Sequence, residues 1–215
     1  MGIMDSTAPS RPPVFTIGHS NLELSAFLAL LTKHQIDAVA DVRSSPFSRF
    51  VPQFNRDVLE STLRKVNVRY VPMGGELGAR RSERECYIES QARYDLIAKS
   101  PLFQQGLDRV RTGAAKFRLA LMCAEKDPLT CHRTILVCRQ LRPALAVQHI
   151  LEDGRLETME QAQRRLLDLM GLPAGDLFQT REELIEQAYD KQGRKIAYME
   201  PAEGGRENAA AETLG

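Results

Sequence analysis

The chain has 215 residues, 43% hydrophobic and 27% charged, a composition that can bury one substantial core. Its 29 basic and 28 acidic residues leave a net charge of +1, which excludes recruitment of nucleic acid or an anionic membrane by an overall field. No apolar run approaches the length of a membrane span, and the first residues lack the apolar core of a signal peptide. We therefore expect a cytoplasmic protein with no membrane partner, whose four cysteines are thiols rather than disulfides.

Strand and helix signals alternate along the chain. Short apolar runs predict strands at residues 14–17, 36–42, 68–71, 117–122 and 145–150. Periodic apolar positions predict helices at about residues 24–31, 55–66, 82–98, 101–113 and 130–141. Because parallel strands need such crossovers, the alternation predicts a three-layer α/β domain over residues 13–155. Its sheet is expected to be mostly parallel, with helices on both faces.

The chain changes character after Gly154. Residues 160–170 and 180–189 carry apolar positions at helical spacing, and we expect a helical extension over residues 156–195, packed on the same domain. Residues 1–12 are polar and rich in Ser and Pro, which predicts a flexible segment. Residues 203–215 have too few large apolar side chains to be ordered, which predicts a disordered tail.

Polar and glycine-rich segments follow the first four predicted strands. In a parallel sheet these segments emerge at one edge, where open α/β proteins bind their ligands. The segments are Gly18-His19-Ser20, Asp41-Val42-Arg43-Ser44, residues 72–81 and residues 123–133. The connections at the opposite edge carry few reactive side chains. This asymmetry predicts a ligand site at the carboxyl edge of the sheet.

The same segments resemble a known family in their residues and their order. They are Thr16-Ile17-Gly18-His19-Ser20, Asp41-Val42-Arg43-Ser44-Ser45-Pro46, Pro52-Gln53-Phe54-Asn55, Gly74-Gly75-Glu76-Leu77-Gly78, Met122-Cys123-Ala124-Glu125 and Cys131-His132-Arg133. The chain is similar, over about residues 14–150, to the prokaryotic family catalogued as domain of unknown function 488. The resemblance implies that these positions are signature residues. It implies no particular activity.

Arginines dominate the candidate substrate-binding residues. A planar guanidinium binds phosphate or carboxylate through paired hydrogen bonds, and glycine loops add backbone donors. The expected substrate-binding residues are Arg43, Ser44, Gly74, Gly75, Arg80 and Arg133. The competing interpretation is that such arginines neutralise Asp41, Glu76 or Glu125. For Arg43 and Arg133 we favour ligand contact.

Four side chains at the same edge are candidates for proton transfer, and two more are candidate thiols. The proton-transfer candidates are His19, Asp41, Glu125 and His132, because imidazole titrates near neutrality and carboxylates exchange protons with it. Each could instead be a structural group that orders a loop or orients a neighbour. The candidate thiols are Cys123 and Cys131, since a cysteine near a helix start can have a depressed pKa.

Two familiar cysteine patterns are missing. The phosphate-cradling arrangement of a cysteine, five residues and an arginine fails, because Leu129 stands six positions after Cys123. This disfavours phosphatase and rhodanese chemistry. The cysteines could bind a metal together with His19, His132 or His149, but the spacing of Cys123 and Cys131 is not that of a usual zinc knuckle. We therefore assign no metal ligands from the sequence.

The leading functional hypothesis is an enzyme that processes a phosphate-bearing substrate, such as a nucleotide or a nucleic-acid terminus. Arginines would hold the anion, while a histidine and a carboxylate would transfer protons. Two alternatives stay open: a thiol-dependent enzyme that uses Cys123 or Cys131, and a nucleotide or nucleic-acid binding module without turnover. The sequence identifies no cofactor and no oligomeric state.

Overall fold

The computed structural model describes residues 13–173, 175 and 178–201, and every structural statement below concerns those residues. The predictions of a flexible segment at residues 1–12 and a disordered tail at residues 203–215 lie outside the described residues. Within the described part, no helix is long and apolar enough to cross a membrane.

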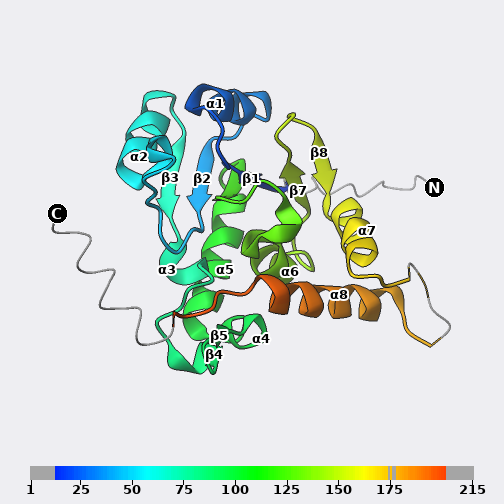
Figure 1. The fold of residues 1–215 in the computed structure, drawn as a ribbon. Coiled ribbons are helices and arrows are strands. Elements are labelled where there is room, and N and C mark those ends of the chain that lie inside the picture. The colour runs from blue at the N-terminus through cyan, green and yellow to red at the C-terminus, as the bar shows by residue number, and fades with distance from the viewer. Residues whose placement is uncertain (1–12, 174, 176–177, 202–215) are drawn as a thin grey trace, which may run out of the picture.

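A six-stranded sheet runs through the centre of the fold, with the strand order β3-β2-β6-β1-β7-β8 (Figure 1). The parallel strands are β1 (Val14–Gly18), β2 (Ala38–Asp41), β3 (Arg69–Pro72), β6 (Leu119–Cys123) and β7 (Val147–Ile150). The last strand, β8 (Leu156–Thr158), pairs with β7 in the antiparallel direction. All residues of β2 and β6 are buried, as expected for inner strands covered on both faces. The predicted mostly parallel α/β fold is confirmed.

Helices cover both faces of this sheet and form two apolar cores. One core joins Phe15 and Met122 of the sheet to α1 (Leu24–Lys33) and α2 (Arg56–Lys65). The other core lies on the opposite face and contains apolar side chains of the remaining long helices. These helices are α5 (Pro101–Ala114), α7 (Met159–Leu169) and α8 (Arg181–Ile196). The predicted C-terminal helices, α7 and α8, therefore pack on the sheet domain.

The longer helices begin where polar caps occur in the sequence. Ser100 accepts a hydrogen bond from the backbone N–H of Phe103 at the start of α5, where Pro101 fills the first turn. Thr180 and Glu183 form a reciprocal capping box at the start of α8. Local chemistry therefore fixes where these helices start.

Shorter elements lie in the connections between the strands and the longer helices. They are η1 (Pro52–Phe54), α3 (Gly74–Leu77), η2 (Arg84–Cys86), α4 (Tyr94–Ile97), η3 (Pro128–Thr130), η4 (Arg133–Cys138) and α6 (Arg139–Leu141). The predicted glycine loop after β3 thus winds into one short helix, α3. The predicted helix at residues 130–141 is helical, but six of its residues, η4, have π-helical hydrogen bonding.

The prediction of a single helix over residues 82–98 is wrong. The segment forms η2, a two-stranded hairpin of β4 (Tyr87–Ile88) and β5 (Gln91–Ala92), and then α4. Glu89 at the hairpin turn has a φ of 53°, a left-handed conformation that ends any helix. The backbone N–H of Ala92 also donates to the carbonyl of Tyr198. This long-range pairing stabilises the extended backbone. The local sequence carries no periodic pattern that would reveal it.

Candidate functional site

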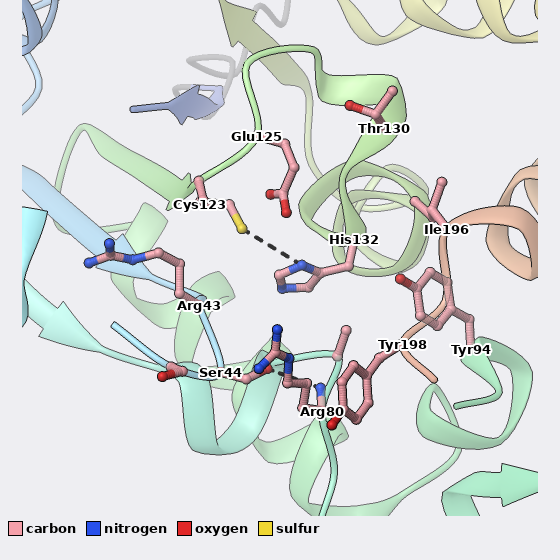
Figure 2. A pocket seen from close by; sticks show the side chains of 13 residues that line it. Arg43, Ser44, Arg80, Tyr94, Cys123, Glu125, Thr130, His132, Ile196 and Tyr198 are labelled. Atoms are coloured by element: carbon pink, nitrogen blue, oxygen red, sulfur yellow. Dashed lines mark hydrogen bonds between the residues drawn. The ribbon is translucent and has the colours of Figure 1, made fainter. Parts of the chain in front are cut away.

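The segments after β1, β2, β3 and β6 lie together at the carboxyl edge of the sheet, because these four strands run in the same direction. A cavity of about 240 Å³ opens at this edge (Figure 2). Its lining residues are Arg43, Ser44, Ser45, Ala79, Arg80, Tyr94, Cys123, Ala124, Glu125, Thr130, His132, Ile196 and Tyr198. The cavity thus combines polar strand-end residues with aromatic and apolar side chains from α4 and the end of α8.

A buried network adjoins the cavity and joins His19, Asp41, Arg43 and Tyr70. Arg43 Nη2 lies 2.6 Å from Asp41 Oδ2, and its Nε donates to both carboxylate oxygens. The Tyr70 hydroxyl donates to the same carboxylate at 2.7 Å. Asp41 is 1% exposed and Arg43 7%, so this ion pair is largely withdrawn from water. The carboxylate of Asp41 is fully engaged in holding Arg43 and Tyr70.

His19 is held in the same network on both sides of its ring. Its Nδ1 lies 2.8 Å from the carbonyl of Ser20, and its Nε2 lies 3.0 Å from Arg43 Nη1. Since a guanidinium only donates, Nε2 accepts and Nδ1 carries the proton. Burial and the charge on Arg43 lower the pKa of His19 to about 4. His19 is therefore neutral at pH 7 and serves as an acceptor that orients Arg43.

His132 presents its free nitrogen to two sulfur atoms. Its Nε2 lies 3.0 Å from the carbonyl of Val42, which accepts the ring proton. Its Nδ1 lies 3.7 Å from Cys123 Sγ and 4.0 Å from Cys131 Sγ. In the neutral ring this nitrogen carries a lone pair that faces both sulfurs. The backbone just after β2 therefore sets the orientation and tautomer of His132.

Cys123, Glu125 and Cys131 complete this group of reactive side chains. Cys131 Sγ lies 2.9 Å from Glu125 Oε2, and Cys123 and Glu125 line the cavity whereas Cys131 does not. Partial loss of solvent around its carboxyl group and the neighbouring Cys131 raise the pKa of Glu125, a residue that is exposed overall. Hydrogen bonding to Cys131 and burial raise the pKa of the Cys123 thiol. Burial would raise the pKa of Cys131, but the hydrogen bond with Cys123 and the charge on Arg133 outweigh burial and lower it.

Arg133 lies beneath the loop that carries Glu125 and does not line the cavity. Its Nη1 donates to the carbonyl of Glu125 at 2.6 Å and its Nη2 to that of Lys126 at 3.2 Å. The same loop packs directly on Gly18, where an added Cβ would lie 1.9 Å from the Glu125 carbonyl oxygen. Only 1% of Arg133 is exposed. The structure thus places Arg133 as a support of the site loop.

Arg80 is the arginine whose charge is left open at the cavity. Its backbone N–H donates to Ser44 Oγ at 3.0 Å, which fixes the start of the side chain. Its guanidinium carbon lies 4.7 Å from the centre of the Tyr198 ring, a cation–π contact. Among the described residues, no carboxylate forms an ion pair with this guanidinium. Figure 2 shows it pointing toward the ring of His132.

The predicted glycines shape the backbone around the cavity rather than line it. A Cβ added at Gly74 would lie 1.9 Å from the Arg43 carbonyl oxygen, so only glycine fits there. A Cβ added at Gly75 would meet no atom within 4 Å. Gly74 therefore allows α3 to pack directly on the backbone after β2, while Gly75 faces open space.

The structure separates the predicted site residues into two groups. The residues that line the cavity are Arg43, Ser44, Arg80, Cys123, Glu125 and His132. The residues that support it from outside its lining are His19, Asp41, Gly74, Cys131 and Arg133, while Gly75 neither lines the cavity nor packs against it. The lining also contains Tyr94, Thr130 and Tyr198, which were not predicted. Tyr198 reaches the site from the segment after α8, far from the predicted motifs in sequence.

Fold and cavity together define an α/β protein with a polar site at the carboxyl ends of its parallel strands. The family model described as Domain of unknown function DUF488 matches residues 23–139. The chain therefore belongs to this family, as its motifs predicted. Searches of curated proteins and of solved structures found no match.

Proposed function

We propose that this protein is an enzyme that binds a phosphate-bearing substrate in the edge cavity and transforms it. The Arg80 guanidinium carries the proposal, because it points into the cavity and has no carboxylate partner among the described residues. Arg80 is exposed at the cavity, and a guanidinium without an ion-pair partner there favours an anion such as a phosphate group. The hydroxyls of Ser44 and Thr130 line the same cavity and can donate to such an anion.

The size of the cavity favours a ligand that is only partly enclosed. Sites for small molecules usually measure about 300–1,000 Å³. The cavity here measures about 240 Å³, slightly below this range. We therefore propose a nucleotide or a nucleic-acid terminus whose base remains outside, and Tyr198 lies at the cavity to contact it.

The proposed roles of the polar residues follow from their contacts. Arg43 lines the cavity, but Asp41 compensates its charge. Arg43 is therefore proposed to orient the anion through hydrogen bonds more than to attract it. Glu125 and His132 line the cavity and remain the proposed groups for proton transfer. His19 and Asp41 are proposed to position Arg43 instead. The reducing cytoplasm remains the proposed location, where free thiols persist.

A thiol-dependent reaction is a second candidate, because Cys123 lines the cavity 3.7 Å from His132 Nδ1. Its raised pKa makes it a weak nucleophile, and Cys131, whose pKa is lowered, does not line the cavity. The geometry therefore supports anion chemistry better. Thiol chemistry requires Cys123→Ser to abolish a measured turnover, and turnover that persists in this variant would exclude Cys123 as the nucleophile.

Calorimetric titration with inorganic phosphate and adenosine monophosphate tests the proposal. We expect Arg80→Ala to weaken binding at least tenfold, because it removes the open positive charge. Arg64→Ala is the matched control, since Arg64 is exposed on α2 and lies outside the cavity. Equal affinities in the wild type and Arg80→Ala would refute anion binding here. Stoichiometric binding of nucleotides and oligonucleotide ends without any product would instead favour the non-catalytic module.

A further inference from the structure

Four metal-binding side chains converge beside the cavity. One donor atom each from Cys123, Glu125, Cys131 and His132 lies within 4.8 Å of all the others. The residues come from the end of β6, from the loop that follows it and from the segment between η3 and η4, which the fold brings together. We propose that these four side chains bind a zinc ion.

The distances from His132 to the two sulfurs are close to those of tetrahedral coordination, whereas the distance from Cys131 to Glu125 is shorter. With Zn–S bonds of about 2.3 Å and Zn–N bonds of about 2.1 Å, a tetrahedral site separates sulfur from nitrogen by about 3.6 Å. The observed separations of His132 Nδ1 are 3.7 Å to Cys123 Sγ and 4.0 Å to Cys131 Sγ. Glu125 Oε2, 2.9 Å from Cys131 Sγ, is closer than two ligands would be, as a thiol hydrogen bond requires. Zinc binding would release that proton, and the sulfur and the carboxylate oxygen would have to move apart to become ligands.

Neighbouring backbone groups orient the donors as they do in metal sites. Ligating histidines usually donate their other ring N–H to a carbonyl or carboxylate, which fixes the tautomer and aims the lone pair. His132 does this through the carbonyl of Val42, 3.0 Å from its Nε2. The backbone N–H of Arg133 points at Cys131 Sγ at 3.4 Å, a contact that stabilises a thiolate. The lone pair of His132 and both sulfurs thus face one common point.

Charge balance supports a divalent ion at this point. Two thiolates and a carboxylate around a dication leave one net negative charge. The guanidinium of Arg133, 1% exposed and bonded to the Glu125 carbonyl, supplies the compensating positive charge. Two sulfur donors favour zinc over magnesium or calcium, which prefer oxygen ligands. The cluster therefore has the composition and the surroundings of a zinc site.

Zinc binding goes beyond the proposed function and stands without it, because Arg80 is not a donor. A zinc ion here would provide a Lewis acid close to the proposed anion, and His132 and Glu125 would then act as ligands instead of proton carriers. Arg80→Ala should keep zinc and lose phosphate affinity. Failure of the anion proposal is thus distinguishable from failure of the zinc proposal.

Metal analysis of the full chain tests the inference. The protein is dialysed with zinc and freed of excess metal, and its metal content is measured by elemental mass spectrometry. A separate titration with cobalt(II) reports thiolate ligands through their charge-transfer absorption. We expect one equivalent of zinc in the wild type and in the control Cys138→Ala, whose cysteine is buried outside the cluster. Cys131→Ser and His132→Gln should each lower the zinc affinity at least tenfold.

Two results would overturn the zinc site. One is less than a tenth of an equivalent of zinc in wild-type protein, with no thiolate band on adding cobalt. The other is unchanged zinc affinity in both Cys131→Ser and His132→Gln. Circular dichroism confirms that each variant is folded, and His132→Gln keeps the test decisive if Cys131→Ser does not fold.

Discussion

Asp41→Asn tests whether this carboxylate holds the site together. Asp41 accepts hydrogen bonds from the Arg43 side chain, from the Arg43 backbone N–H and from the Tyr70 hydroxyl. The amide keeps the shape but removes the charge, and the Arg43 guanidinium then stays buried without a counter-ion. Breaking one partner of a buried ion pair costs about 3–5 kcal/mol. We therefore expect Asp41→Asn to lower the free energy of unfolding by about 3–5 kcal/mol.

Urea unfolding followed by circular dichroism measures this loss. Asp95→Asn is the matched control, because Asp95 is 49% exposed and pairs with Arg93 at the surface. Such pairs contribute about 0–1 kcal/mol. The double variant Asp41→Asn with Arg43→Met removes both charges and should recover part of the stability. A loss below about 1 kcal/mol in Asp41→Asn would refute the structural role of this ion pair.

Two further predictions concern residues beside the cavity. Gly74→Ala should lower the free energy of unfolding by about 1–3 kcal/mol, because its Cβ would collide with the Arg43 carbonyl. Gly75→Ala is the control and should change the stability little. Equal urea midpoints for the two variants would contradict this packing. His19 has a pKa of about 4 in the folded chain and about 6.5 when unfolded, so the unfolded state takes up the proton first as pH falls. Between pH 7 and 5 the wild type should lose about 2 kcal/mol more unfolding free energy than His19→Asn. A midpoint near 6.5 for His19 in a nuclear magnetic resonance titration would contradict it.

The sheet and its edge could be predicted because their signals are local. Runs such as Val14–Gly18 and Leu119–Cys123 are mostly apolar, which is the pattern of strands buried on both faces. Parallel pairing then brings the polar segments after these strands to one edge. The antiparallel strand β8 was not anticipated, because its three residues alternate in burial and give too short a signal.

The division of roles among the site residues could not be predicted, because it depends on side-chain packing. The sequence shows that Arg43 and Arg80 both lie in segments that follow strands. Only the structure shows that Asp41 compensates the charge of Arg43, whereas the Arg80 guanidinium contacts the Tyr198 ring. Cys123 and Cys131 are separated by a loop whose path depends on Arg133. Their convergence on His132 is therefore a property of the folded chain and has no spacing signature.

A crystal structure of the protein with adenosine monophosphate bound tests the central claim most directly. We predict that the phosphate oxygens lie about 3 Å from the Arg80 guanidinium, inside the cavity that Glu125 and His132 line. A nucleotide bound at another surface, with the Arg80 guanidinium free of it, would contradict the account.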